Sequence, residues 1–233
     1  MRPMAPETTV GEIVRAVPAR SRIFENLGID YCCGGKKSLA EACRAKGLDL
    51  AKVVDMLVAL DRTPDSAAEN PDAMSLSELC DHIEQVHHGY LTEELPRLDF
   101  MTRKVAVVHG DHEPRLLEVR RVFEAFAAEM TAHTKEEEEA IFPVIRQLES
   151  ANGGKAKATA SLKDSFTKLE SEHGRAGSAL ARFRELTDNY CPPDWACNTF
   201  RALYDGLAQL EEDTHQHVHK ENNVLFPRTL AVR

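Results

Sequence analysis

The chain lacks the features of a membrane-spanning, secreted or nucleic-acid-binding protein. No apolar run approaches the ~20 residues that span a bilayer, and the N-terminus MRPMAPETTV has no apolar stretch typical of a signal peptide. Acidic residues outnumber basic ones by 38 to 29, for a net charge of −9, whereas nucleic acids and anionic membranes select clustered positive charge. We therefore expect a cytoplasmic protein whose main partner is neither nucleic acid nor membrane.

Alternating β-branched residues, the pattern of a β-strand, are also hard to find. Apolar residues instead recur at heptad-like spacing along most of the 233 residues, which is the pattern of amphipathic helices. Three Ser/Thr-x-x-Glu sequences match the capping box that begins a helix. They pair Thr9 with Glu12, Ser38 with Glu41, and Ser75 with Glu78. The sequence therefore predicts an all-α protein.

The helical pattern divides the chain into two parts. Residues 1–60 hold short helical pieces broken at Pro18, Gly28, Gly34–Gly35 and Gly47, which predicts a small domain of three or four helices. The segment 61–74 is polar and contains two prolines, so we interpret it as a linker. Residues 75–233 then hold four longer helical patterns, at about 75–100, 111–149, 159–188 and 194–228.

Four amphipathic helices with modest connections predict an antiparallel four-helix bundle. The pattern leaves the state of residues 101–112 open, whereas Pro192 and Pro193 must interrupt a helix. In a reducing compartment the cysteines should be mostly free thiols. The six are Cys32, Cys33, Cys43, Cys80, Cys191 and Cys197.

An internal repeat places metal-ligating residue types at matched positions. The sequences HTKEEEEAIFP and HVHKENNVLFP align His133 with His217 and Glu137 with Glu221. The His and the Glu of each copy are four residues apart, so both side chains leave the same face of a helix about one turn apart. One isolated copy would most often be a surface ion pair, but two copies at identical spacing favour a shared metal site.

Each copy is preceded by a further histidine at nearly the same distance. His88 lies 45 residues before His133, and His173 lies 44 residues before His217. A bundle with pseudo-twofold symmetry would bring four imidazoles and two carboxylates to one level of its core. The remaining histidines are interpreted as non-ligands, although a slip of one residue would exchange His87 for His88. They are His82, His87, His109, His112, His215 and His219.

Four imidazoles and two carboxylates suit a pair of iron or manganese ions. The set is too large for one tetrahedral zinc, lacks the thiolates of structural zinc, and has more imidazole than magnesium or calcium accept. Two irons bridged by Glu137 and Glu221, with the four histidines as terminal ligands, would keep positions for an oxo or hydroxo bridge and a small exogenous ligand. We expect a redox-active centre that diatomic molecules such as NO or O2 can reach.

The chain resembles a known family over nearly its whole length. The sequences IDYCCGGKKSLAEAC, LESEH and KENNVLFPR, together with the two His-x-x-x-Glu copies, are similar to the iron-sulfur cluster repair di-iron proteins of the YtfE/ScdA type. The resemblance implies a hemerythrin-like bundle behind a Cys-containing N-terminal domain. It also implies iron ligands at His88, His133, Glu137, His173, His217 and Glu221.

The resemblance further implies a protein of the bacterial response to nitrosative and oxidative stress. Such a protein restores damaged iron-sulfur clusters, and iron supply from the di-iron centre is the favoured route. Two alternatives remain: an enzyme that reduces nitric oxide to nitrous oxide with an electron donor, and a sensor or store of a diatomic ligand. A homodimer is compatible with the family. Oxygen-carrying hemerythrins use more histidines, which speaks against oxygen transport.

Cys32 and Cys33 stand in front of a predicted helix start. The nearby Lys36 and Lys37 predict an electropositive environment that favours thiolate. The other interpretation is that Cys-Cys-Gly-Gly shapes a tight turn and the cysteines are small buried apolar residues. The resemblance favours a role in handling iron or NO beside the di-iron site, outside its ligand set. The other four cysteines are interpreted as structural.

Three glutamates flank the predicted ligands. Glu136, Glu138 and Glu172 could orient the imidazoles or relay iron or protons. They could equally face water, and we favour that position for Glu136 and Glu138.

Overall fold

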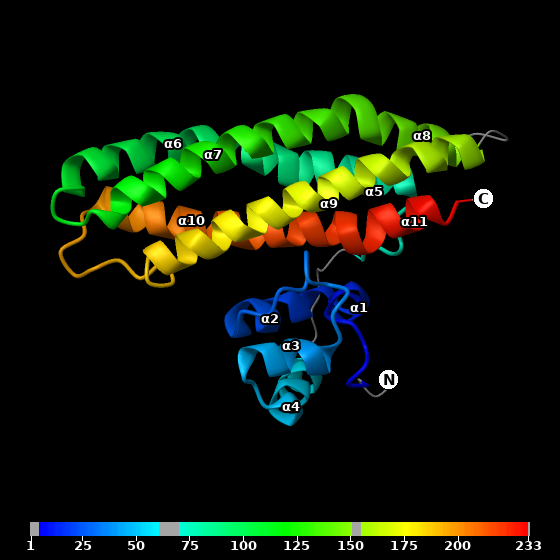
Figure 1. Ribbon diagram of the computed structural model, residues 1–233, viewed down its shortest axis with the longest axis horizontal. Coiled ribbons are helices and arrows are strands. Elements are labelled where there is room, and N and C mark those ends of the chain that lie inside the picture. Colours follow the sequence, from blue (N-terminus) through cyan, green and yellow to red (C-terminus); the bar gives the residue numbers. More distant parts are fainter. Residues whose placement is uncertain (1–4, 61–69, 151–154, 233) are drawn as a thin grey trace.

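The computed structural model describes residues 5–60, 70–150 and 155–232, and helices dominate all three ranges (Figure 1). The all-α prediction is confirmed, since the sole β-type pairing in these ranges is an isolated bridge between Thr9 and Ser38. No helix among the described residues combines the length and apolarity that crossing a membrane requires. All six cysteines are free thiols.

Four long helical rods form the bundle, and three of them contain a π-helical turn. The first rod consists of α5 (Leu76–His82), η2 (Ile83–His88) and α6 (Gly89–His109), and the second of α7 (Arg115–Glu136), η3 (Glu137–Ile141) and α8 (Phe142–Ser150). The third rod is the single helix α9 (Lys155–Leu186). The fourth consists of α10 (Asn198–Lys220), η4 (Glu221–Leu225) and α11 (Phe226–Leu230). Figure 1 shows the rods packed side by side, which confirms the four-helix bundle.

The rods end close to the predicted positions, with one clear difference. The first rod continues through the segment whose state was left open and ends only at His109. The third rod ends at Leu186, and Asp188, Asn189 and Tyr190 then adopt left-handed backbone with φ of 51°, 58° and 60°. This turn comes before Pro192–Pro193, so the chain has left the helix before the prolines would disrupt it.

A small helical unit precedes the bundle, as predicted. It consists of α1 (Val10–Ala16), the short 3₁₀ helix η1 (Pro18–Arg20), α2 (Ser21–Leu27), α3 (Leu39–Lys46) and α4 (Leu50–Leu60). All three predicted capping boxes are present, at α1, α3 and α5. Residues 61–69 of the predicted linker lie outside the described residues, and residues 70–74 form a turn ahead of α5.

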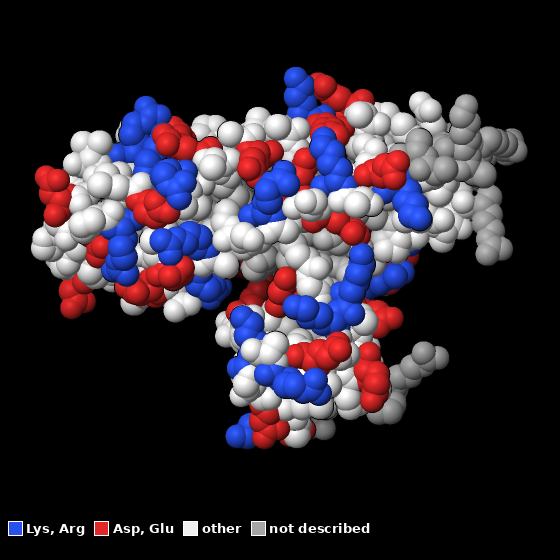
Figure 2. Space-filling view, viewed as in Figure 1, with Lys and Arg blue, Asp and Glu red and all other residues white. Residues whose placement is uncertain are grey.

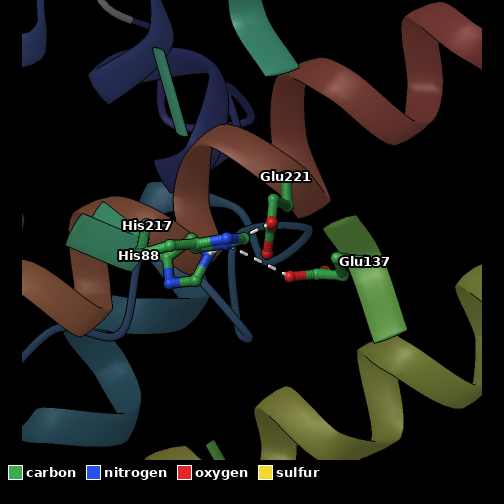
Figure 3. Close-up of side chains that lie close together, drawn as sticks. All are labelled: His88, Glu137, His217 and Glu221. Atoms are coloured by element: carbon green, nitrogen blue, oxygen red, sulfur yellow. Dashed lines mark hydrogen bonds and ion pairs between the residues drawn. The ribbon is translucent and has the colours of Figure 1, made fainter. Parts of the chain in front are cut away.

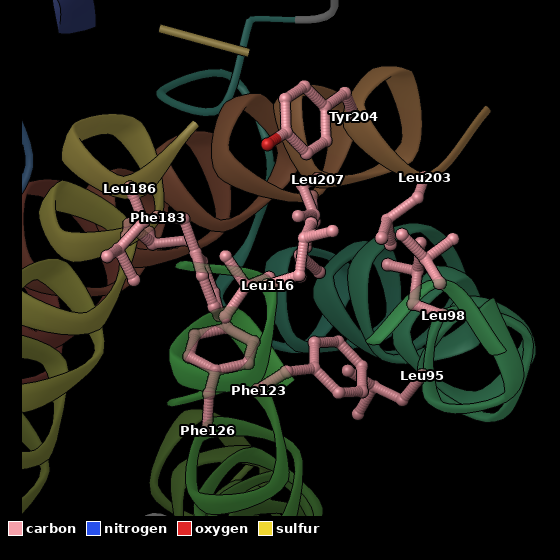
Figure 4. Packing of buried hydrophobic residues seen from close by; sticks show 14 of the residues in the cluster. Leu95, Leu98, Leu116, Phe123, Phe126, Phe183, Leu186, Leu203, Tyr204 and Leu207 are labelled. Carbon is pink, nitrogen blue, oxygen red and sulfur yellow. The ribbon is translucent and has the colours of Figure 1, made fainter. Parts of the chain in front are cut away.

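Two apolar clusters fill the bundle, one toward each end. The first includes Leu98, Leu116, Phe123, Phe183 and Leu207 (Figure 4). The second includes Ile83, Phe142, Leu169, Leu225 and Phe226. Each buried Leu or Phe contributes about 1.5–3 kcal/mol relative to exposure. Along every rod the predicted metal ligands fall between the residues of the two clusters, so apolar packing on both sides holds a polar layer.

The N-terminal unit docks on the bundle through its Cys-Cys segment. Asn223 donates a hydrogen bond of 3.1 Å to the backbone oxygen of Cys32, and Lys36 pairs with Glu170 at 3.0 Å. Val218 of α10 also belongs to the apolar cluster of the N-terminal unit. Figure 2 shows Lys and Arg interspersed with Asp and Glu over both parts, so the described residues on this face form no extended patch of one sign.

Candidate metal centre

All six predicted ligands meet in the polar layer, and every rod contributes at least one. His88 is the last residue of η2, and His173 lies on α9. The first copy of the repeat supplies His133 and Glu137 where α7 meets η3. The second copy supplies His217 and Glu221 where α10 meets η4. None of the six residues is more than 4% exposed. The pseudo-twofold arrangement expected from the repeat is therefore present in the structure.

The repeat extends to the backbone. Glu137 and Glu221 are each the first residue of a π-helical turn, and a third such turn ends at His88. Turns of this kind are rare inside helices and occur mostly at functional sites, because the wider ring shifts the side chains that follow it. The sequence predicted the two side chains on one face but gave no sign of the π-helical turns.

The imidazoles form two pairs, each facing inward through Nε2. The Nε2 atoms of His88 and His217 are 3.2 Å apart, and those of His133 and His173 are 3.0 Å apart. Two nitrogen ligands at right angles on one metal, with bonds of about 2.1 Å, lie about 3 Å apart. Each pair therefore has the spacing of two ligands on one metal ion.

Each of the two carboxylates directs one oxygen to each imidazole pair. Glu137 places Oε2 3.4 Å from Nε2 of His88 and Oε1 3.3 Å from Nε2 of His133. Glu221 places Oε1 3.1 Å from Nε2 of His217 and Oε2 3.1 Å from Nε2 of His173. Both glutamates thus belong to two separate donor groups, one of which is drawn in Figure 3. This is the arrangement expected of carboxylates that bridge two cations.

Hydrogen bonds on the outer side fix three of the imidazoles. Nδ1 of His88 lies 2.8 Å from Oε1 of Glu138, and Nδ1 of His133 lies 2.9 Å from Oε2 of Glu172. Because these oxygens are acceptors, each Nδ1 donates and each Nε2 presents a lone pair to the centre. Glu172 and Glu138 thus each orient an imidazole. Glu138 also faces water, as we favoured, since its side chain is 46% exposed. Glu136 instead pairs with Lys168 on the surface.

Asn222 completes this set and was missed in the sequence. Its Oδ1 accepts from Nδ1 of His173 at 2.9 Å. Asn222 stands five residues after His217, as Glu138 stands five residues after His133, so extending the repeat by one position would have found it. Nδ1 of His217 is the exception, because it is buried and has no hydrogen-bond partner among the described residues.

The chemistry of the donor set fits cations. Both oxygens of Glu137 and Oε2 of Glu221 are buried without a hydrogen-bond donor in the described part of the chain. Burying such groups unpaired costs several kcal/mol each. Inward lone pairs of imidazoles and carboxylates at 3.0–3.4 Å repel one another unless a cation or a proton lies between them. The residues present therefore suit two metal ions.

Burial and mutual charge separate the pKa values of the two carboxyl groups. Burial, and then the charge of Glu221, raise the pKa of Glu137 to about 8. Burial also acts to raise the pKa of Glu221, but the imidazoles of His217 and His173 outweigh it and hold that pKa well below its usual range. Without a metal, Glu137 therefore keeps a proton near neutral pH while Glu221 is ionised.

The histidines interpreted as non-ligands lie outside both donor groups. His87 is the closest of them, since its ring stacks on that of His217 with centroids 5.3 Å apart. Its Nδ1 lies 2.7 Å from Oδ1 of Asp213, and its Nε2 lies 2.6 Å from Nζ of Lys220. His87 therefore supports His217 from behind, while His88 faces the centre.

The two adjacent cysteines lie beside the centre, against α9 and η4. Sγ of Cys33 is 3.3 Å from the backbone oxygen of His173. Its hydrogen bond with Cys32 lowers the pKa of Cys33, while the same bond and burial raise the pKa of Cys32 well above its usual range. The predicted electropositive environment is wrong for Cys32, because its nearest charged partner is Asp30, at 3.3 Å.

Fold and site together define a hemerythrin-like metal-binding bundle carrying a small helical N-terminal domain. The family model for the "Hemerythrin HHE cation binding domain" matches residues 80–229. The model ScdA_N, described as "Domain of Unknown function (DUF542)", matches residues 6–61.

Curated relatives match both parts in one chain. The chain is 36% identical to the iron-sulfur cluster repair protein YtfE of Cronobacter sakazakii, over 95% of this chain and 96% of that protein. It is 37% identical to YtfE of Edwardsiella ictaluri, over 95% and 96%, and 33% identical to the iron-sulfur cluster repair protein ScdA of Staphylococcus epidermidis, over 95% and 97%. The chain belongs to the YtfE/ScdA family of iron-sulfur cluster repair proteins.

Proposed function

We propose that this protein repairs damaged iron-sulfur clusters by supplying iron from a di-iron centre. The proposal rests on one observation above the others: Glu137 and Glu221 each direct one oxygen to each of the two imidazole pairs. The relatives are named for iron-sulfur cluster repair. The metal would be held by His88, His133, Glu137, His173, His217 and Glu221. Six imidazole and carboxylate ligands suit a pair of irons, because the set is too large for one tetrahedral zinc and has more imidazole than calcium or magnesium accept.

The protein's own residues prepare the site for both holding and releasing a cation. Glu138, Glu172 and Asn222 orient three imidazoles so that Nε2 faces the centre. Bound iron would supply redox chemistry and the material that a client protein accepts. When iron leaves, Glu137 takes up a proton at neutral pH, because burial and the Glu221 charge raise its pKa to about 8. This proton removes the repulsion between the carboxylates of Glu137 and Glu221, which would otherwise favour rebinding of iron.

The chain is further proposed to act as two domains, residues 1–60 and 75–233, joined by a linker over 61–74. Separate apolar clusters in the two parts support this division. Cys32 and Cys33 would handle iron or NO beside the di-iron centre, without being ligands of that centre. Their position supports this, since Sγ of Cys33 touches the backbone of His173. The partners would be damaged iron-sulfur proteins that receive iron.

The test is iron content and Mössbauer spectroscopy on the iron-loaded protein. We expect about two coupled irons per chain in the parent, as in carboxylate-bridged bundles, and their loss in a Glu137→Ala, Glu221→Ala variant. Glu139→Ala is the matched control, because Glu139 follows Glu137 in η3 but its side chain is 68% exposed. The parent and Glu139→Ala should transfer iron to an apo-cluster acceptor, and the Glu137→Ala, Glu221→Ala variant should not. A single uncoupled iron, or a pair indifferent to both glutamates, would contradict the proposal.

A second candidate function is the binding and reduction of nitric oxide at the same centre. A cavity of about 260 Å³ reaches His133 and is lined in part by Phe126, Met130 and Ala176, which gives a small apolar molecule a route inward. Steady-state conversion of NO to N2O with an electron donor would establish an enzyme. Tight binding of NO or O2 without turnover would instead indicate a sensor or store.

A further inference from the structure

Three donor groups gather at a second place, outside the bundle centre. The carboxylate of Asp30 and the thiols of Cys32 and Cys33 each offer a ligand atom, and these atoms all lie within 4.8 Å of one another. Sγ of Cys32 is 3.9 Å from Sγ of Cys33 and 3.3 Å from Oδ1 of Asp30. Asp30 was not among the residues predicted from the sequence to act with the two cysteines.

These separations suit one tetrahedral cation. With metal–sulfur bonds of about 2.3 Å and a metal–oxygen bond of about 2.1 Å, tetrahedral geometry separates two sulfurs by about 3.8 Å and a sulfur from an oxygen by about 3.6 Å. The observed separations of 3.9 Å and 3.3 Å lie close to these values. A small movement of Asp30, which is exposed, would complete the fit.

The backbone holds the three donors in place before any cation binds. The backbone N–H of Cys32 donates to Oδ1 of Asp30 at 3.0 Å. A Cβ on Gly34 would lie 2.9 Å from the backbone oxygen of Asp30, so glycine is needed where the loop closes on this residue. The Asn223 hydrogen bond to the backbone oxygen of Cys32 fixes the loop against the bundle.

One side of the cluster stays accessible to small solutes. The three donors line a cavity of about 350 Å³ between the Cys-Cys segment and the helices α9 and α10, and His215 and Glu211 line the same cavity. A fourth ligand, from water or from one of these side chains, therefore has room to bind. Cys32 is buried and Cys33 is half-buried, so Cys33 is the more accessible of the two thiols.

We propose that Asp30, Cys32 and Cys33 form a second, mononuclear site for a divalent thiophilic cation such as Fe²⁺ or Zn²⁺. Two thiolates and a carboxylate are a borderline-soft donor set, unlike the imidazole-rich bundle centre. Binding exchanges the thiol protons for the cation and releases them to water, with no change of oxidation state. The site goes beyond the proposed function, because its formation needs neither iron in the bundle nor repair activity.

Cobalt(II) is the probe for the test, because thiolate ligands give it a charge-transfer absorption in the near ultraviolet that imidazole and carboxylate ligands do not. The full-length protein should show this band. The intensity of the band should stop increasing once one cobalt ion per chain is bound to the thiolates. Cys32→Ser with Cys33→Ser should abolish it. Asp30→Asn keeps an oxygen acceptor for the backbone N–H of Cys32, so the loop should hold while cobalt affinity falls on the order of tenfold or more.

Cys197→Ser is the matched control, because Sγ of Cys197 lies 3.3 Å from Nε2 of His109 and offers a competing thiol–imidazole pair. The band should survive in this variant. Its absence from the parent, its persistence without Cys32 and Cys33, or its loss in Cys197→Ser would overturn the proposal. Circular dichroism of each variant checks the fold. The iron content of the bundle is measured in parallel and should not change, so failure of this site and failure of the di-iron centre are distinguishable.

Discussion

Asn222 accepts a hydrogen bond of 2.9 Å from Nδ1 of His173, in the register where Glu138 accepts from His88 in the other half of the bundle. A neutral carboxamide thus stands where the first half has a carboxylate. The halves differ at a second place, since Glu172 accepts from His133 whereas the matching His87 only stacks on His217. The ligands repeat almost perfectly, but the groups that orient them do not.

Loss of the Asn222 side chain should weaken metal binding. Asn222→Ala removes the acceptor of His173, and loss of such an outer hydrogen bond costs on the order of 10–100-fold in metal affinity. Competition with a chelator measures the effect. Asn223→Ala is the matched control, because Asn223 contacts the backbone of Cys32 rather than an imidazole of the centre. Equal affinity in parent and Asn222→Ala would show that the hydrogen bond does not orient the ligand.

The two irons should be spectroscopically distinct. The pair His133 and His173 has both imidazoles anchored, one by a carboxylate and one by a carboxamide. In the pair His88 and His217 only His88 is anchored, since Nδ1 of His217 has no hydrogen-bond partner among the described residues. Mössbauer spectra of the reduced protein should therefore contain two quadrupole doublets of equal area. One doublet that fits both irons would contradict this asymmetry.

The fold could be predicted in detail because helix signals are local. Capping boxes such as Ser75 with Glu78 and the terminating glycines depend on residues within one turn, and the structure reproduces them. The state of residues 101–109 could not be decided, because Val107 and Val108 are exposed and obscure the apolar spacing. The helix continues there because buried residues such as Val105 pack against the rest of the bundle.

The candidate site could be predicted where it depends on spacing and not where it depends on three-dimensional contact. The repeat predicted the six residues that the structure brings together, since His133 and Glu137 are fixed one turn apart by the helix itself. The nearness of Asp30 to Cys32 follows from a turn that only the folded loop creates. The role of Glu138 likewise depends on a contact with His88, fifty residues earlier in the chain.

A methyl group at Gly35 should separate the N-terminal unit from the bundle. A Cβ there would collide with Oδ1 of Asn223 across the contact between the two parts, and it would lie 2.7 Å from the backbone oxygen of Tyr31 in the same loop. The loop that docks on Asn223 must therefore change shape. We expect Gly35→Ala to increase the radius of gyration measured by small-angle X-ray scattering. The iron content should stay at the parental value, because the ligands all lie in the bundle.

Gly174→Ala is the control for this variant, because an added Cβ at Gly174 meets nothing within 4 Å. It should leave the scattering curve unchanged. If Gly35→Ala scatters like the parent, the contact with Asn223 does not hold the two parts together.

In the metal-free protein, the stabilising contribution of a protonated Glu137 should be lost as the pH rises toward about 8. Burial lowers the pKa values of His87, His217 and His219 to about 2, 3 and 4, and these groups act in the opposite direction, so the contribution of Glu137 is measured against a Glu137→Gln variant. Burial and the Glu221 charge raise the pKa of Glu137 to about 8, so the folded state binds a proton in this range that the unfolded state, with its ordinary carboxyl pKa of about 4.3, has already lost. Because Glu137 binds more protons in the folded state, its contribution to stability falls with rising pH and levels off above the folded pKa.

Urea unfolding of the metal-free protein at a series of pH values measures this dependence. Glu137→Gln keeps the shape of the side chain but cannot lose a proton, so the stability of this variant should fall less, or rise more, with pH than that of the parent. Loaded metal should also flatten the slope, because a cation replaces the proton between Glu137 and the imidazoles. A slope of stability against pH that Glu137→Gln leaves unchanged would show that Glu137 is already ionised in the metal-free fold.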